Sequence, residues 1–511
     1  MNLTQKTIRA GSWQFVSVAA KVIIQLFVIA ILARHISPQE FGLIALANVA
    51  LVFVEMFAEA GIGPAIIQRK NLTKDYIQAG FTLAVLSGIF FVAVLWLLAP
   101  LIANFFKSEQ LTDVIRWLGL PILVIKFGTI SRSLLERDMR FDKLAWVDIG
   151  SYSFGYAIVS ITMAILGYGV WAIVAGKITQ CCLQSMFSFL LCPHPIKPVF
   201  VVEKYKSIGI YGGGLTIARF FDTLASQGDI FIVGRFCGTS LLGIYERAAS
   251  IMTMPGQYLG YVIDKAMFPA MSTIQDNSIR LQNAYLRAIG LVNIILVPFS
   301  VLMFLVAPEL IGLLLGPNWT EAVIPFRILI ITLSLRIVGN LSDTLVRATG
   351  AVYASARRKP VFAFFVIFGS WVGQHWGIAG VAIAVNIAIV INYAIFTQLS
   401  MKLINMKFTT YFNDFKKGYL LGGILLIISF ILISALRFYT NSAFIILSVG
   451  CIGSILLLLV IMFCFLPILL DNTIFWFLFQ LMGENCWKLP VVGNRIKSSQ
   501  TYSVSSFDEI P

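Results

Sequence analysis

The sequence has little charge for its length. Asp, Glu, Lys and Arg together make up 12% of its 511 residues, whereas a soluble domain carries roughly 25%. Hydrophobic residues make up 59% of the chain, and the mean hydropathy is +0.88. This composition excludes a soluble globular protein. It predicts an all-α integral membrane protein, because a helix satisfies its own backbone hydrogen bonds in lipid.

The residue patterns of metal sites, redox sites and nucleotide hydrolysis are also missing. The seven cysteines include no CxxC pair, and the histidines His35, His194 and His375 are far apart in the sequence. Gly176-Lys177 lacks the other residues of a phosphate-binding loop, and no nucleophile elbow is present. We therefore expect no metal, no cofactor and no enzymatic activity.

Long apolar runs divide the chain into spans. Runs of about 18 to 26 residues, separated by short polar loops, predict about fourteen transmembrane helices. Their approximate limits are 11–33, 41–63, 78–102, 114–134, 144–166, 169–191, 208–234, 241–263, 286–307, 323–346, 359–375, 378–400, 417–436 and 443–470. The first run is longer than a signal-peptide core, so we expect it to be retained.

Basic residues are distributed unevenly between the loops. If the N-terminus is cytoplasmic, the outer segments hold only Arg34, Lys107, Arg116, Arg235, Arg247, Arg327 and Arg437. Most of the other lysines and arginines then lie on the cytoplasmic side, as the positive-inside rule requires. This distribution explains the net charge of +14 without a nucleic-acid partner, and it predicts that both termini are cytoplasmic.

The second half of the chain repeats the first. Arg34 to Gly42 (RHISPQEFG) and Arg235 to Gly243 (RFCGTSLLG) have the same end residues at the same separation, with an offset of 201 residues. The offset grows to 208 at Ala99-Pro100 and Ala307-Pro308, as loop insertions would produce. Six spans in each repeat is an even number, so we expect two parallel bundles related by an axis along the membrane normal.

The repeat predicts five segments. They are an N-terminal six-helix bundle over 1–192, a cytoplasmic linker over 193–207, a second six-helix bundle over 208–403, two additional transmembrane helices over 404–471, and a polar cytoplasmic tail over 472–511.

One predicted span carries a polar stripe. Between Tyr211 and Gly243, polar residues recur at spacings of three and four, so they share one helix face: Thr216, Arg219, Asp222, Ser226 and Asp229. A bilayer penalises such a stripe unless it faces protein or a wet cavity. Lys21 and Gln25 in the first span precede Asp222 and Ser226 by the same 201 residues, so both stripes are expected to face one axis.

Several motifs match those of a known family: GSWQFVSVAAKVIIQLFVIAILARHISPQEFGLIALANV and FAEAGIGPAIIQRK near the start, SLLERDMRFDKLAWVDI, GYGVWAIVAG, and DIFIVGRFCGTSLLGIYERA. Over about residues 1–400 the sequence resembles the polysaccharide flippases of the multidrug/oligosaccharidyl-lipid/polysaccharide exporter superfamily, of the colanic-acid and O-antigen exporter type. The tail after Asp471 departs from this family, and we assign it no role.

The resemblance implies both a fold and a function. The two bundles would form a V around a central cavity and work by alternating access. The substrate would be undecaprenyl-pyrophosphate-linked oligosaccharide, moved from the cytoplasmic to the periplasmic leaflet of a bacterial inner membrane for lipopolysaccharide or exopolysaccharide biosynthesis. Membrane lipid would surround the protein, and a polysaccharide polymerase and a chain-length regulator are possible partners.

A pyrophosphate that crosses hydrocarbon needs cations in a water-accessible cavity. The spans hold the cations Lys21, Lys126, Lys177, Arg219 and Arg336. We predict that the substrate is bound by Lys21, Gln25, Lys126, Arg219, Ser226 and Arg336. The alternatives are a buried ion pair, such as Arg219 with Asp222 one turn away, and snorkelling of a long side chain to the interface.

Acidic residues in the spans are candidates for coupling to an ion. They are Glu55, Glu59, Asp148, Asp222, Asp229 and Asp343, and all but Asp148 are assigned to ion coupling here. Glu55 and Glu59 lie one turn apart, so one helix face holds two carboxylates. The alternative for Glu59 is a pair at the helix end near the cytoplasmic surface.

Two other functions fit the composition less well. A cation-coupled multidrug exporter of the same fold would need a cavity dominated by acids, whereas these spans hold several cations. A membrane glycosyltransferase or an O-antigen polymerase or ligase would need a large periplasmic loop for its catalytic groups. The predicted outer loops are too short for that.

Overall fold

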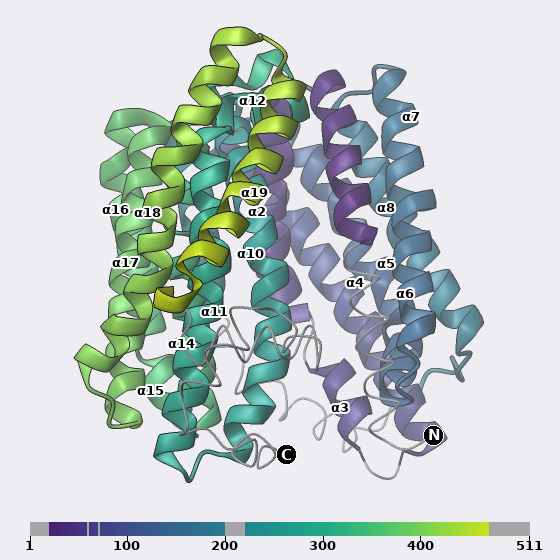
Figure 1. Cartoon of the computed structure of the whole chain (residues 1–511). Coiled ribbons are helices and arrows are strands. Elements are labelled where there is room, and N and C mark those ends of the chain that lie inside the picture. The colour runs from purple at the N-terminus through teal and green to yellow at the C-terminus, as the bar shows by residue number, and fades with distance from the viewer. Residues whose placement is uncertain (1–19, 59–60, 70–71, 200–219, 470–511) are drawn as a thin grey trace. The chain divides into compact units, whose positions relative to one another are not determined.

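The computed structural model describes residues 20–58, 61–69, 72–199 and 220–469. Every regular element within these ranges is a helix (Figure 1). The predicted first and seventh spans are described only from residues 20 and 220 onward, and the predicted tail lies outside the described residues. The predicted all-helical architecture is therefore confirmed for the described chain.

The first half of the chain begins with a helix over residues 20–35. It continues with α2 (Pro38–Ala58), α3 (Ile62–Gln68), α4 (Lys74–Phe105), α5 (Gln110–Arg137), α6 (Phe141–Gly150), the π-helix η1 (Ser151–Ile158), α7 (Val159–Ile165) and α8 (Val170–Leu191). α6, η1 and α7 follow one another without a break and together cover the predicted span 144–166.

The second half begins with a helix over residues 220–236. It continues with α10 (Thr239–Thr273), α11 (Ser278–Leu305), α12 (Ala307–Leu314), the 3₁₀-helix η2 (Pro317–Ala322), α13 (Val323–Ile330), α14 (Leu333–Ala348), α15 (Val352–Ala356), α16 (Lys359–Gly373), the 3₁₀-helix η3 (Gln374–Trp376), α17 (Gly377–Leu403), α18 (Phe408–Tyr439) and α19 (Ala443–Leu469).

Seven helical stretches among the described residues are long and apolar enough to cross a membrane: Pro38–Gln68, Lys74–Phe105, Gln110–Arg137, Phe141–Ile165, Ser278–Leu305, Val352–Leu403 and Phe408–Tyr439. An eighth is added if Pro317–Ile330 and Leu333–Ala348, which meet at a bend of 46°, form one span. The chain is a multi-pass membrane protein. The count of fourteen spans stays a prediction.

The helices pack into two compact units. The first holds the described residues up to Leu259, together with Leu310–Leu329 and Val352–Asn392. The second holds Gly260–Glu309, Ile330–Ala351 and the described residues from Tyr393 onward. α10 and α17 each contribute residues to both units.

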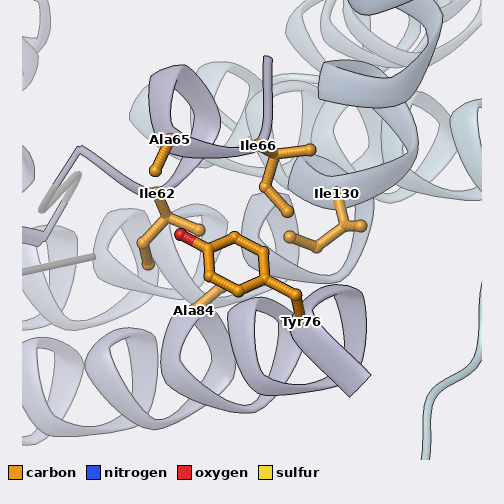
Figure 2. Packing of buried hydrophobic residues seen from close by; sticks show 6 residues of the cluster. All are labelled: Ile62, Ala65, Ile66, Tyr76, Ala84 and Ile130. Carbon is orange, nitrogen blue, oxygen red and sulfur yellow. The ribbon is translucent and has the colours of Figure 1, made fainter. Parts of the chain in front are cut away.

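In the first unit, α3, α4 and α5 share a small apolar core, which Figure 2 shows from close by. The ring of Tyr76 lies among Ile62, Ile66 and Ile130, and Ala65 and Ala84 complete the cluster. Arg137, at the end of α5, donates a hydrogen bond of 2.8 Å to the backbone carbonyl of Ile66. The apolar core and this hydrogen bond fix the short helix α3 against α5.

The first unit also contains a reciprocal contact between the two sequence repeats. A Cβ atom on Gly42 would overlap the carbonyl oxygen of Thr239, and a Cβ atom on Gly243 would overlap the carbonyl oxygen of Pro38. The repeat offset of 201 residues relates Gly42 to Gly243 and Pro38 to Thr239. The first turns of α2 and α10 therefore pack against each other in a symmetric way that only glycine permits.

Residues of η2 and α12 support this contact. Trp319 is fully buried and donates a hydrogen bond of 2.9 Å from Nε1 to the carbonyl of Ala33. Its ring meets that of Phe41 edge to face, with the centroids 5.3 Å apart. The Arg34 guanidinium donates to the carbonyl of Leu313 at 3.0 Å.

In the second unit, α18 packs along α11 through glycines. A Cβ atom on Gly418 would lie 2.7 Å from the Cβ atom of Asn293, and one on Gly422 would meet Val297. At the other end of α18, Arg437 binds both carboxylate oxygens of Glu309 at 2.8 and 2.9 Å. The close glycine contacts hold the predicted thirteenth span against the ninth, and the bidentate ion pair links α18 to α12, which follows α11.

The glycine contact between α11 and α18 makes a prediction about stability. Gly418→Ala should lower the thermal unfolding midpoint in detergent, because overpacking a tight contact costs about 1–3 kcal/mol. Gly423→Ala is the matched control, since a Cβ atom there would meet nothing within 4 Å. The stability of the control variant should be unchanged or higher by up to about 1 kcal/mol, because alanine has a greater helix propensity than glycine. Equal midpoints for the two variants would refute the packing.

Candidate functional site

A charged cluster lies where α5, α6 and α8 meet in the first unit. The Arg132 guanidinium binds the Asp148 carboxylate with both of its terminal nitrogens, at 2.6 Å to Oδ1 and 3.0 Å to Oδ2. Gln184 of α8 donates to Asp148 Oδ1 at 3.1 Å. The pair remains accessible, because 34% of the Arg132 side chain and 24% of the Asp148 side chain are exposed.

Two further cations belong to this cluster. Lys21, on the helix over residues 20–35, interacts electrostatically with Asp148 and, more weakly, with Lys177 and Arg132. Lys21 Nζ also lies over the ring of Tyr152, 5.9 Å from its centroid. We call Lys21, Arg132, Asp148, Lys177 and Gln184 the Asp148 cluster. Arg132 and Lys21 act on Asp148, Lys177 acts on Lys21, and Glu136 of α5 pairs with Arg132 at 3.4 Å. The three cations therefore outnumber the two carboxylates.

The π-helix η1 places tyrosines beside this cluster. Tyr152 and Tyr156 stack at 5.2 Å between centroids, and Tyr258 of α10 donates to Gln25 Oε1 at 3.3 Å. A π-helix is rare and often occurs at functional sites. The side chains of Lys21 and Gln25, both predicted to contact substrate, therefore lie among tyrosine hydroxyl groups.

Small residues bring α8 close enough to form the cluster. A Cβ atom on Gly155 of η1 would lie 2.7 Å from the backbone nitrogen of Gln180, and one on Gly128 of α5 would lie 2.7 Å from Ser185 Cα. Ser185 also donates to the carbonyl of Val124 at 2.7 Å. These contacts bring Gln184 to Asp148 of α6, and Lys177 lies two turns earlier on the same face of α8.

The other predicted residues of the first half have separate surroundings. Lys126 is buried and donates at 2.9 Å to the carbonyl of Ala58, at the end of α2. Glu55 is exposed on α2, and both its charge and that of Lys177 act on Cys181 of α8. Glu59 lies outside the described residues.

The predicted stripe of the seventh span is described from residue 220 onward, so Arg219 lies outside the described residues. Asp222 pairs with Lys359 of α16, with 2.5 Å between Nζ and Oδ2. Asp229 accepts from the Tyr245 hydroxyl at 2.7 Å and from the Ile230 backbone at 2.9 Å. Ser226 is exposed and donates to the carbonyl of Thr223.

The remaining two predicted residues, Arg336 and Asp343, belong to α14 in the second unit. Asp343 lines a cavity of about 250 Å³ and lies 3.3 Å from Arg347 Nε. Arg347 also pairs with Asp264 of α10 at 2.7 Å, and Thr344 donates to the same carboxylate. This cavity therefore holds an acid that the sequence reasoning missed.

The sequence does contain signals for the residues that were missed. Pro64-Ala65 and Pro269-Ala270 match at an offset of 205 residues. By the same offset, Asp264 is the equivalent in the second repeat of the predicted coupling residue Glu59. Arg132 lies at the end of the predicted span 114–134 and is not among the predicted substrate contacts; α5 continues to Arg137. Asp148 is a candidate acid in the sequence, and spacing alone does not identify Arg132 as its partner.

No group of three His, Cys, Asp or Glu side chains suited to a metal ion occurs among the described residues. His194, in the segment after α8, packs against the rings of Phe81 and Phe189. Burial lowers the pKa of His194 below its usual value, so this side chain is neutral at pH 7.

The comparisons with known proteins agree with this architecture. The chain is 24% identical to the teichuronic acid biosynthesis protein TuaB of Bacillus subtilis, over 84% of this chain and 89% of that protein. It is 24% identical to the lipopolysaccharide biosynthesis protein WzxC of Escherichia coli, over 77% of this chain and 80% of that protein.

Among solved structures, the lipid II flippase MurJ in its inward closed conformation matches with a TM-score of 0.71 at 15% identity, covering 89% of this chain and 97% of that chain. This likeness shows a shared fold. The family described as "Polysaccharide biosynthesis protein" matches residues 31–324, more than half of the sequence. The chain therefore belongs to the polysaccharide biosynthesis protein family.

Proposed function

We propose that this protein is a flippase. Its substrate is an undecaprenyl-pyrophosphate-linked oligosaccharide, which it moves from the cytoplasmic to the periplasmic leaflet of a bacterial inner membrane for lipopolysaccharide or exopolysaccharide biosynthesis. We assign it no enzymatic activity. A polysaccharide polymerase that uses the delivered oligosaccharide and a chain-length regulator are its expected partners.

The observation that carries this proposal is the excess of cations in the Asp148 cluster. Lys21, Arg132 and Lys177 lie in helices that are otherwise apolar, where an ionised side chain is costly unless it is paired or serves a function. Asp148 and Glu136 supply two negative charges against these three cations, and both acids pair with Arg132. A pyrophosphate supplies the missing negative charge, and phosphate oxygens match the fork of the arginine guanidinium.

The relatives point to the same class of substrate. TuaB is named for teichuronic acid biosynthesis and WzxC for lipopolysaccharide biosynthesis. One solved structure with the same fold is a lipid II flippase, and another is a multidrug resistance transporter. The family and the charge of the cluster therefore favour flipping of a lipid-linked saccharide over export of cationic drugs.

The proposed architecture follows from the sequence repeat. About fourteen spans form two six-helix bundles, over 1–192 and 208–403, arranged as a V around a central cavity, with the linker 193–207 between them. Two further helices over 404–471 and a tail over 472–511 follow, and both termini are cytoplasmic. The reciprocal contact of Gly42 and Gly243 supports the repeat, because residues related by one offset play equivalent parts in it.

The same contact supports alternating access. In the proposed orientation, the first turns of α2 and α10 lie at the periplasmic end, where Trp319 and Arg34 join them. Their close packing closes this end, so the substrate enters from the cytoplasmic side. Release requires α2 and α10 to separate. Glycine permits both states, since it allows tight closure and leaves no side chain to interlock.

The proposed site centres on Lys21 and Gln25, and Arg219, on the predicted polar stripe of the seventh span, is a further proposed substrate contact. Lys126, Ser226 and Arg336 complete the predicted substrate contacts. The predicted ion-coupling residues are Glu55, Glu59, Asp222, Asp229 and Asp343. Of these, Asp343 has the most suitable surroundings, because it shares an accessible cavity with Asp264 and Arg347.

The first test is complementation of a bacterium that lacks its own exporter of this type. Lys21→Ala and Arg219→Ala should lower surface polysaccharide and accumulate lipid-linked intermediates. The loss of a charged hydrogen bond to phosphate costs about 1.5–3 kcal/mol, or about tenfold or more in affinity. Lys21→Arg should retain most activity, and Lys402→Ala, at the exposed end of α17, is the matched control.

Other results of this test would be equally informative. If the wild-type protein restores no polymer but lowers drug accumulation, the protein is a multidrug exporter and the flippase proposal is wrong. If the variants restore polymer as well as wild type at matched protein levels, the transport function stands, but Lys21 and Arg219 do not bind the substrate.

A second test concerns the periplasmic end. Gly42→Ala and Gly243→Ala should prevent closure, because each added methyl group overlaps a backbone carbonyl. Polymer export should fall, and labelling of Gln25→Cys by an impermeant maleimide from the periplasm should rise severalfold in a background without other cysteines. Gly312→Ala, where a methyl group meets nothing within 4 Å, should change neither. Unchanged labelling in the Gly42 variant would contradict the gate.

A further inference from the structure

The arrangement around Asp148 has a consequence that depends on the proposed function. Both oxygens of the Asp148 carboxylate are occupied: Oδ1 accepts from Arg132 and Gln184, and Oδ2 accepts from Arg132. The carboxylate thus occupies the terminal donors of the guanidinium fork, the same donors that bind a phosphate in two-point contacts. An anionic ligand cannot take both donors of Arg132 while Asp148 holds them.

We propose that Asp148 is an internal counter-ion that occupies the cationic site when no substrate is present and that the pyrophosphate displaces. Asp148 is in this sense a specificity-determining residue. It offsets part of the cost of holding Lys21, Arg132 and Lys177 close together in apolar helices, where cations without nearby anions are strongly unfavourable. Glu136 holds the same arginine through Nε at 3.4 Å, so Arg132 keeps one anchor when Asp148 is displaced.

Displacement makes the site selective for highly charged groups. A ligand must interact with Lys21, Arg132 and Lys177 more favourably than the tethered carboxylate does. A pyrophosphate, with two phosphate groups, can span several cations, whereas a monophosphate or a chloride ion replaces the carboxylate with little net gain. The selectivity of the site is then the difference between the binding free energies of the pyrophosphate and of the competing anion.

The covalent attachment of the Asp148 carboxylate to α6 also promotes release of the substrate. After displacement, Asp148 remains on α6, close to the bound anion, and like charges repel. The carboxylate re-forms its ion pair with Arg132 as the ligand leaves, so the positive charge of the site is again partly balanced. The side chain therefore lowers affinity and speeds dissociation, and transport benefits because a substrate held too tightly is not delivered.

The experiment measures binding of undecaprenyl pyrophosphate and of undecaprenyl monophosphate to the full-length protein in lipid nanodiscs. Asp148→Asn should bind the pyrophosphate about tenfold more tightly and release it correspondingly more slowly, while polymer export in cells falls. Its preference for pyrophosphate over monophosphate should shrink. Asp138→Asn, an exposed position with the same change in charge, is the control and should behave as wild type.

Salt gives a readout that a purely structural role would not affect. Wild type carries its own counter-ion, so bulk chloride competes little for the cations. In Asp148→Asn, chloride fills the vacated positions, and binding should weaken more steeply between about 0.05 M and about 0.5 M NaCl. If the Asn variant does not fold, Gln184→Ala removes one hydrogen bond that holds Asp148 and should tighten pyrophosphate binding about two- to fivefold.

The outcomes separate this inference from the proposed function. If wild type binds undecaprenyl pyrophosphate but Asp148→Asn binds it equally or more weakly, with an unchanged salt dependence, Asp148 is not a counter-ion and the flippase assignment stands. If wild type binds neither polyprenyl phosphate and restores no polymer, the proposed function fails and this inference fails with it.

Discussion

The cost of ionised groups in hydrocarbon determines how the first unit is built. Arg132 and Asp148 form a bidentate pair between α5 and α6, and Gln184 of α8 completes the hydrogen bonding of the carboxylate. Removing one partner of such a pair leaves an uncompensated charge, which costs more than the pair itself contributes. The three helices must therefore meet at this point. The positions of Lys21 and Lys177 follow from where those helices lie.

Close backbone packing makes this meeting possible. Gly155 and Gly128 let α8 approach η1 and α5 within distances that any larger residue would prevent. Because lipid gives little hydrophobic drive for helices to associate, small residues and interhelical hydrogen bonds take over that role. The π-helix shifts the side-chain register within one continuous span. Within η1, Tyr152 lies under Lys21 Nζ and stacks with Tyr156.

In the second unit, neutral hydrogen bonds between helices accompany the ion pair of Arg437 with Glu309. Tyr285 of α11 and Ser342 of α14 share a hydrogen bond of 2.6 Å, Tyr393 of α17 and Tyr411 of α18 share one of 2.7 Å, and Ser334 bonds to Tyr419 at 2.9 Å. The bonds of Tyr411 and Tyr419 link α18 to α17 and α14, and the bond of Tyr285 links α11 to α14. Another group of charges in this unit, Asp264, Asp343 and Arg347, lines one cavity.

The sequence by itself determined the class of the protein, the position of most spans and the repeat. Length and hydropathy suffice for these, because hydrocarbon admits only helices of a certain length. The offset of 201 residues even related the two glycines that meet in space. Spacing also selected Lys21 and Gln25, since polar residues three and four apart share a face.

Only the tertiary structure decided which charges meet. Asp222 pairs with Lys359, which is 137 residues away in the sequence, and Arg132 pairs with Asp148 on another helix. Helical periodicity predicts the face on which a residue lies but not the neighbour that the face will meet. That neighbour depends on backbone approach at glycines and on the register shift of η1, which no local pattern in the sequence encodes.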